Sequence, residues 1–192
     1  MTMKLWLVFA AVTVLAGCVR PVSLHYLAPQ QNMVATRPLI GTVTVVDERG
    51  GAPAEIGAVM GPDGKPLKTL VVSHDIANVV GDIARHALFA RNELTPNGSG
   101  PYELRIELLG LDAQQWADRQ AQVDIVVSVV DRRTGRRVFV TRTYAEQRGD
   151  NYLAEDNQFL GSPAALSRDE SETLARAIDS VLDHAALVIA MN

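Results

Sequence analysis

The strongest constraint on the fold is the stretch YELRIEL at residues 102–108, in which apolar and charged residues alternate without exception. Successive side chains of a β-strand point to opposite faces of the sheet, so the apolar residues of this stretch share one face and its charged residues share the other. A strand with one apolar and one charged face is typical of an antiparallel sheet that has water on one side. The sequence therefore predicts a sheet with one exposed face and a core behind the other.

Five further segments are expected to be strands, because β-branched and other apolar residues dominate them and turn residues separate them. They are residues 39–46, 54–60, 67–72, 122–131 and 138–146. The turn at residues 61–65 contains Pro-Asp-Gly, in which proline presets φ and glycine tolerates positive φ, and it predicts a hairpin. The turn at residues 132–136 carries Gly135 where a left-handed residue is needed, and it predicts a second hairpin.

Two segments show the spacing of amphipathic helices. Between residues 76 and 88, apolar residues recur every three or four positions, and Ser73 or Asp75 can cap the start of this helix. Near the C-terminus, Ser167 and Glu170 have the spacing of a capping box, in which each side chain satisfies an amide of the other's backbone. A second apolar stripe follows, so a second helix is expected to begin there.

The order of these elements is strand, hairpin, helix, strand, hairpin, helix. Hairpins and strict alternation favour antiparallel pairing over parallel crossover units, and each helix has one apolar side to bury. We therefore expect an α+β domain built as a two-layer sandwich, with a mainly antiparallel sheet of about five or six strands covered on one face by two amphipathic helices. No second folded domain is expected, because the loops separate elements that need a common core.

The N-terminal segment, residues 1–17, is expected to be a signal peptide that is removed. Lys4 is followed by about a dozen apolar residues, whereas a helix that spans a membrane needs about 20. A positive start, a short apolar stretch and small residues at its end are features of a secretory signal. Residues 18–37 are then expected to be a tether and residues 38–192 a single periplasmic domain, although residues 24–27 also fit a short edge strand.

Cys18 is the single cysteine of the chain, so it cannot form an internal disulfide. It ends the sequence Leu-Ala-Gly-Cys, which resembles the lipobox of bacterial lipoproteins. The resemblance implies cleavage before Cys18 and a covalent diacylglycerol and N-acyl lipid on this residue, with no other cofactor. Val19 follows, and in such lipoproteins a residue other than aspartate there implies an outer-membrane anchor with the domain facing the periplasm. The simpler alternative is an ordinary signal that ends by chance beside a buried cysteine.

The charge of the chain argues against a polyanionic partner. It has 22 acidic and 18 basic residues, a net charge of −4 with neutral histidines, and no run of like charge. Nucleic-acid binding depends on clustered Lys and Arg residues that neutralise phosphates. We therefore expect no nucleic-acid partner.

Segments spread along nearly the whole chain resemble the YajG-type family of small bacterial lipoproteins. They are the lipobox, GTVTV at 41–45, LVVS at 70–73, Ile76 and Val80 in the expected helix, YELRI at 102–106, VDIVV at 123–127 and AIDSVL at 177–182. This resemblance implies a lipid-anchored periplasmic protein with no established enzymatic activity. We therefore expect a non-catalytic protein that binds an envelope protein or a cell-wall component. Its oligomeric state stays open.

A second resemblance is confined to HYLAP at residues 25–29. It is similar to an aromatic-Leu-x-Pro segment found soon after the lipobox in auxiliary lipoproteins of ABC-type lipid transport systems. This resemblance implies an accessory subunit of such a transporter. The later part of the chain departs from that pattern, so this function is the alternative to the first.

The residue types that carry most enzyme chemistry are scattered. No pair among the four histidines has metal-ligand spacing, so no metal site is expected; they are His25, His74, His86 and His184. The sequence has no Gly-x-Ser-x-Gly turn and no phosphate-binding glycine loop. We therefore expect no catalytic residues, with an envelope hydrolase as the least favoured alternative.

Asp124 interrupts an otherwise apolar strand. An unpaired buried carboxylate is costly, so we expect Asp124 to lie at a solvated end or to pair with Arg105 or Arg142. A catalytic acid is the less favoured interpretation.

Aromatic residues in polar loops are the candidate partner-binding residues. Trp116 lies in the polar segment 111–119, and Tyr152 and Phe159 lie in the polar segment 147–163. Aromatic side chains in polar surroundings are common anchors at interfaces. We hypothesise a partner-binding rim formed by these two loops. The alternative is that Trp116 folds back over the edge of the core.

Overall fold

A computed structural model describes residues 18–26, 38–116, 118–149, 162–184 and 187 of the chain. The strands are β1 (Cys18–Val22), β2 (Ile40–Asp47), β3 (Glu55–Met60), β4 (Pro66–Val72), β5 (Tyr102–Gln115), β6 (Arg119–Asp131) and β7 (Arg137–Gly149). The helices are α1 (Ile76–Ala90) and α2 (Pro163–Leu182). Within these described ranges, no helix is long and apolar enough to cross a membrane.

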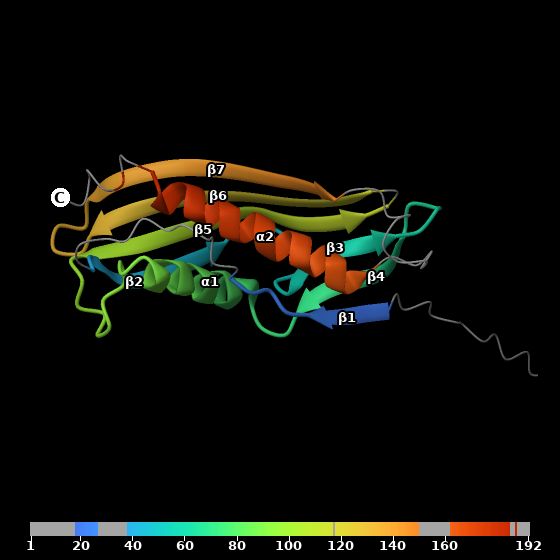
Figure 1. Cartoon of the computed structure of the whole chain (residues 1–192), viewed down its shortest axis with the longest axis horizontal. Coiled ribbons are helices and arrows are strands. Elements are labelled where there is room, and N and C mark those ends of the chain that lie inside the picture. Colours follow the sequence, from blue (N-terminus) through green and yellow to red (C-terminus); the bar gives the residue numbers. More distant parts are fainter. Residues whose placement is uncertain (1–17, 27–37, 117, 150–161, 185–186, 188–192) are drawn as a thin grey trace, which may run out of the picture.

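All seven strands form one sheet, in the order β1-β4-β3-β5-β6-β7, with β2 beside β5 (Figure 1). The long strand β5 organises it. One edge of β5 pairs along its length with β6, while the other edge pairs first with β2 and then, at residues 113–115, with β3. The hairpin β3–β4 and strand β1 therefore extend the sheet beyond the end of β2.

The predicted fold class was wrong. The sheet has seven strands and is mixed, because β1–β4, β2–β5 and β3–β5 are parallel pairs. The helices therefore do not lie on a mainly antiparallel sheet: α1 packs against β2, which is parallel to β5, and α2 runs mainly along β6 and the edge strand β7. Parallel neighbours need a crossover connection. Here α1 lies in the connection from β2 to β5, and hairpin patterns carry no information about that pairing.

The individual strands agree better with the sequence than the fold class does. Both predicted hairpins, β3–β4 and β6–β7, are antiparallel pairs, and the alternating stretch begins β5. The polar segment 111–119, however, was expected to be a linker. Instead β5 continues to Gln115 and β6 begins at Arg119, so the turn is only a few residues long.

A bulge explains how β5 continues beyond the alternating stretch. Leu108 pairs with Ile125 and Gly110 with Asp124, so Leu109 is an extra residue in the strand. An extra residue shifts which side chains face inward. As a result Leu104, Ile106 and Leu108 are buried before the bulge, and Leu111 and Ala113 are buried after it. The core face of β5 thus stays apolar along its whole length.

The end of β5 approaches β3 closely at Gly57. This residue has φ of 150°, and a Cβ added to it would lie 1.9 Å from the carbonyl oxygen of Ala113. Both its conformation and the space available therefore require glycine. Gly57 lets the β3–β4 hairpin join the long strand.

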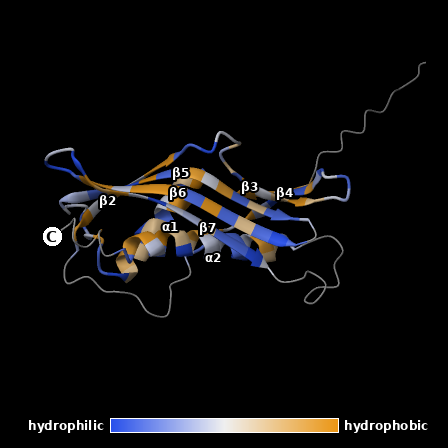
Figure 2. Cartoon of the chain, turned by 90° about the horizontal axis from the view of Figure 1, so that it is seen from above, coloured by the Kyte–Doolittle hydropathy of each residue, from blue (hydrophilic) through white to orange (hydrophobic). Residues whose placement is uncertain are grey.

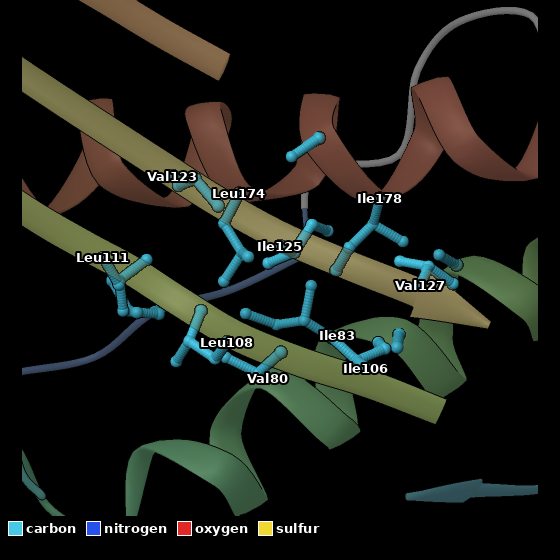
Figure 3. Close-up of a cluster of buried hydrophobic side chains, with 14 of the residues drawn as sticks. Val80, Ile83, Ile106, Leu108, Leu111, Val123, Ile125, Val127, Leu174 and Ile178 are labelled. Atoms are coloured by element: carbon cyan, nitrogen blue, oxygen red, sulfur yellow. The ribbon is translucent and has the colours of Figure 1, made fainter. Parts of the chain in front are cut away.

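The core lies where side chains of both helices meet those of β5 and β6. Figure 3 shows ten of these residues pointing toward one another, and none is more than 4 % exposed: Val80, Ile83, Ile106, Leu108, Leu111, Val123, Ile125, Val127, Leu174 and Ile178. Burying one such side chain contributes about 1.5–3 kcal/mol. In Figure 2, apolar and polar residues alternate along β5, β6 and β7, as expected for a sheet with a core on one face only.

The second helix begins earlier than the capping-box pattern predicted. Ser162 is the N-cap, its hydroxyl accepts a hydrogen bond from the Ala165 amide at 3.2 Å, and Pro163 occupies the first turn. Proline is well suited to that position, because its missing N–H has no intrahelical partner there. Ser167 and Glu170 consequently lie inside α2, where both are buried. At α1 the cap is Asp75, one of the two predicted residues.

Candidate functional site

Cys18 lies at the first residue of β1, on the edge of the sheet. Its thiol is exposed, and the strand runs parallel to β4 with Cys18 opposite Lys68. Val19 is 61 % exposed beside it. The residue expected to carry a lipid is therefore accessible to solvent and is already part of the sheet.

The segment after β1 was expected to belong to a tether, but it packs against the domain as far as residue 26. Leu24 is buried, and the amide of His25 donates a hydrogen bond to Ser171 Oγ in α2 at 3.3 Å. The hydroxyl of Tyr26 donates to Asp179 Oδ1 at 3.0 Å. A group attached to Cys18 would therefore be held close to the folded domain.

Tyr26 is fixed by a buried cluster of charges, named here the Arg91 cluster, which consists of Tyr26, Arg91, Asp179 and Asp183. Arg91 caps the C-terminus of α1 and its side chain is fully buried. Its guanidinium lies 2.8 Å from Asp179 and 3.2 Å from Asp183, and it donates a hydrogen bond to the Tyr26 hydroxyl at 3.1 Å. The cluster joins the N-terminal segment to both helices.

In the Arg91 cluster, the guanidinium group and the carboxylates each favour the charged form of the other. Burial opposes the charged form of Arg91, but the Tyr26 hydroxyl and the carboxylates of Asp179 and Asp183 outweigh it and raise its pKa. Burial also raises the pKa of Asp179, although Arg91 and the Tyr26 hydroxyl oppose that effect. Glu93 lies beside the cluster, and its burial raises its pKa to about 7 against the opposing charge of Arg91.

A cavity of about 370 Å³ opens between residues 22–26, the end of β4 and α1. Three of the four histidines, His25, His74 and His86, line it together with Asp82. Sequence reasoning did not predict this convergence, because each of the three histidines comes from a different segment of the fold. Within the described residues, no group of three His, Cys, Asp or Glu side chains is placed to hold a metal ion.

One pair at the cavity has the residue types of a nucleophile and a base. Ser73 Oγ lies 2.9 Å from His74 Nδ1, and both side chains are exposed. A serine nucleophile also needs a third group that orients the base. The neighbouring carboxylate of Asp75 instead accepts a hydrogen bond from the Ala77 amide at 2.8 Å and caps α1. Asp75 is therefore not the group that orients His74.

The structure describes one of the three predicted partner-binding residues. Trp116 lies at the turn between β5 and β6 and is 65 % exposed, so it does not fold back over the core. Tyr152 and Phe159 lie outside the described residues. The rim formed by these three residues stays a prediction.

Asp124 has the partner that the sequence predicted. Both of its carboxylate oxygens accept hydrogen bonds from Arg142 across the sheet, at 2.9 Å and 2.5 Å. The hydrogen bonds from Arg142 hold the pKa of Asp124 below its usual value, although partial burial opposes this. Asp124 is therefore a charged partner in the sheet rather than an acid poised to donate a proton.

The Arg91 cluster was missed by sequence reasoning. Arg91 and Glu93 follow a helix and precede a loop rich in glycine, where charged residues are normally solvated. The one available signal is the spacing of Asp179 and Asp183, which puts two carboxylates on the same side of α2.

Comparisons with known proteins identify a shared fold. No family model matches the chain, and no curated protein matches it. The fold is similar to that of a Xanthomonas campestris protein of the family DUF330, with a TM-score of 0.60 at 10 % identity, over 88 % of this chain and 95 % of that one. At this identity the match shows the fold alone.

Two further solved structures are more distant. The protein CT253 of Chlamydia trachomatis has a TM-score of 0.45 at 10 % identity, over 80 % of this chain and 99 % of its own. Lipoprotein GNA1162 of Neisseria meningitidis has a TM-score of 0.33 at 15 % identity, over 59 % of this chain and 87 % of its own. Neither carries an argument about this chain, and the YajG-type resemblance stays a prediction.

Proposed function

We propose that this chain is a non-catalytic lipoprotein of the bacterial envelope, anchored through lipids on Cys18. The observation that carries this proposal is the position of Cys18. It directly follows a short apolar leader, ends a Leu-Ala-Gly-Cys sequence and is exposed at the first residue of β1.

The structure supports an anchor that holds the domain close to the membrane. Each buried methylene contributes about 0.8 kcal/mol, so one acyl chain binds reversibly while two or three bind stably. Residues 18–26 pack against β4 and α2 through β1, Leu24 and the Arg91 cluster. The lipid would therefore lie beside β1, with little free chain between it and the sheet.

Membrane fractionation of cells that produce the full chain tests the anchor. We expect the unaltered chain to be found in the membrane fraction and to incorporate a clickable fatty acid. We expect Cys18→Ser to incorporate none. Ser23→Ala is a matched control, because Ser23 is exposed close to Cys18 but has no role in acylation. Equal incorporation by Cys18→Ser and the unaltered chain would remove the basis of the proposal.

The proposed location is the outer membrane, with the domain facing the periplasm. Val19 after the lipidated cysteine supports this, because aspartate at that position favours retention at the inner membrane in many bacterial lipoproteins. Val19 is exposed, so a substitution there leaves the core intact. We expect Val19→Asp to move the chain to the inner-membrane fraction of a density gradient, whereas Val19→Ser stays with the outer membrane. The proposed location fails if Val19→Asp leaves the distribution unchanged.

The proposed role is binding of another envelope component. An exposed tryptophan supports this role, because Trp116 exposes about two-thirds of its surface without a packing reason. Crosslinking in living cells, followed by identification of co-purified proteins, tests it. We expect Trp116→Ala to lose a partner that the unaltered chain captures, while its unfolding midpoint stays the same. Capture of the same partners by both chains would exclude Trp116 from the binding surface.

A second candidate function is an accessory subunit of an ABC-type lipid transport system. The observation that favours it is the placement of His25 and Tyr26, the first two residues of the HYLAP segment, which form hydrogen bonds to Ser171 and Asp179 of α2. Residues that hold a fixed position on the domain are part of its fold rather than of a tether. This favours a structural likeness to the auxiliary lipoproteins that carry the same segment. Genes for a permease, an ATPase and a substrate-binding protein beside this gene would support the transporter function, and their absence would favour the first proposal.

A further inference from the structure

Strand β7 is an unusually long edge. It spans Arg137–Gly149, 13 residues, and among the described elements it pairs with β6 only (Figure 1). Natural proteins usually protect an edge strand by keeping it short or by adding charged side chains, especially lysine, proline or a bulge, because unpaired backbone groups attract another strand. β7 contains neither lysine nor proline, and its charged residues have both signs: Arg137, Arg142, Glu146 and Arg148. Its one bulge lies near its start, and from Phe139 onward its register with β6 is regular.

The open face of β7 also carries exposed apolar side chains. Val138, Val140 and Tyr144 are 37 %, 52 % and 57 % exposed. They alternate with residues on the core face, such as Phe139, which is 9 % exposed. The strand therefore combines a free backbone edge with an apolar surface beside it, which is the combination that favours strand addition.

The charge pattern of β7 is complementary to itself. Arg142 and Glu146 lie two residues on either side of Tyr144. In an antiparallel pair of β7 strands centred on Tyr144, Arg142 of each copy is opposite Glu146 of the other. Opposite charges on facing positions stabilise paired strands, and like charges destabilise them. A centre one residue later, at Ala145, would instead place Arg142 opposite Arg148.

The existing ion pairs fit this arrangement. Arg142 already contacts Asp124, and Glu146 contacts Arg148 at 2.7 Å. Pairing centred on Tyr144 would place the Arg142 guanidinium between two carboxylates and the Glu146 carboxylate between two guanidinium groups. Positive and negative side chains would therefore alternate across the interface between the two β7 strands.

We infer that β7 pairs with β7 of a second copy of this chain, antiparallel and centred on Tyr144, so that one sheet runs through a twofold-symmetric dimer. Twofold dimers are the commonest symmetric assemblies, and their interfaces use the same patch on both subunits. The inference does not depend on the lipid anchor, because β1 and β7 are at different ends of the strand order.

Disulfide trapping in the full chain tests the dimer. The background is Cys18→Ser, so that an introduced cysteine is the single thiol. Opposite Cα atoms in antiparallel strands are about 4.5–5.5 Å apart, which is within the range of a disulfide. Tyr144→Cys is therefore expected to give a species of twice the chain mass on a non-reducing gel after mild oxidation, at least tenfold more than the control.

The matched control is Val140→Cys, which is on the same strand and exposed to a similar degree. In the proposed register the two copies of residue 140 would be about 27 Å apart, since a strand rises about 3.4 Å per residue. Sedimentation of the reduced Tyr144→Cys chain is expected to give the dimer mass. A monomer mass with no trapping at residue 144, or equal trapping at residues 140 and 144, would overturn the inference.

Discussion

Among the described residues, Arg91 and Glu170 are the two charged side chains with no exposed surface, and their surroundings differ completely. Arg91 contacts Asp179, Asp183 and the Tyr26 hydroxyl near the C-terminal end of α2. Glu170 lies in the first half of α2, and neither of its carboxylate oxygens has a hydrogen-bond partner within the described residues. One site is built to hold a charge, and the other favours a neutral group.

The difference shows which buried polar groups organise this fold. Burial is the largest effect on Glu170 and raises its pKa well above the usual value, and Asp112 adds to the shift while Arg49 opposes it. Arg91 is instead compensated, because its partners come from the N-terminal segment and from α2. Removing one charge of a buried ion pair leaves its partner buried without a counter-charge, which destabilises the folded chain. Removing a buried charge that has no counter-charge instead stabilises the folded chain. The predictions below test this contrast.

The largest effect is expected for Arg91→Met. The substitution leaves Asp179 partly buried without its cation, and breaking a buried pair by removing one partner costs about 3–5 kcal/mol of unfolding free energy. Urea unfolding followed by circular dichroism measures the loss. Arg85→Met is the matched control, because Arg85 pairs with Asp82 on the surface of α1, where ion pairs contribute about 0.5 kcal/mol. Equal losses of unfolding free energy in the two variants would show that the Arg91 cluster stabilises the fold no more than a surface ion pair does.

Glu93 is expected to make the stability depend on pH. Burial raises its pKa from 4.5 to about 7, so the folded chain binds more protons than the unfolded chain between these values. The contribution of Glu93 to the free energy of unfolding must therefore fall as pH rises from about 4.5 to 7, by at most about 3 kcal/mol, and stay level above that range. Glu93→Gln is expected to remove this fall. The free energy of unfolding is measured for both chains at a series of pH values. An equal fall with pH in both chains would show that Glu93 does not cause the pH dependence.

Glu170→Gln is expected to stabilise the chain at high pH. Because the folded pKa of Glu170 is raised, the unaltered chain loses stability as pH rises above the usual range of a glutamate, whereas glutamine stays neutral. We expect a gain of about 1–2 kcal/mol at pH 8 and little change at pH 5. Glu48→Gln, on an exposed residue, is the control and should change neither value. A loss of stability at pH 8 would indicate that Glu170 has a cationic partner.

The most local effect is expected for Tyr26→Phe. This change removes the hydroxyl that contacts Arg91 and Asp179 but keeps the ring, and a hydrogen bond to a charged group contributes about 1.5 kcal/mol. The effect should be local, because Tyr26 links the segment after β1 to the helices. Hydrogen exchange of the β1 amides is expected to accelerate several-fold, with the β5 and β6 amides unchanged. Equal acceleration in all strands would mean that Tyr26 supports the whole fold rather than the N-terminal segment.

The sequence predicted local structure better than the arrangement of strands. Alternation in residues 102–108 and the two turn motifs are local signals, and the structure has strands and hairpins at each of them. The parallel pairing of β2 with β5 depends on contacts across a helix, so no local pattern specifies it. The bulge at Leu109 was missed for a similar reason, since Leu108-Leu109-Gly110-Leu111 breaks the alternation and suggests that the strand ends.

Of the predicted site residues, Cys18 is the one that belongs to a contiguous sequence motif, and its lipidation stays a prediction. Arg91, Asp179 and Tyr26 meet although they lie far apart along the chain, and each is an ordinary surface residue type. The three histidines around the cavity are another case, because their convergence follows from the placement of β1 and α1 rather than from any spacing. Charged residues that end up in a core are therefore the part of this protein that sequence patterns describe least.

Lipidation at Cys18 is tested most directly by mass spectrometry of the N-terminal peptide, isolated from bacterial membranes after proteolysis. We expect a peptide that begins at Cys18 and carries a diacylglycerol group on sulfur and an acyl group on its amine. A peptide that begins at another residue, or one that begins at Cys18 with an unmodified thiol, would contradict it.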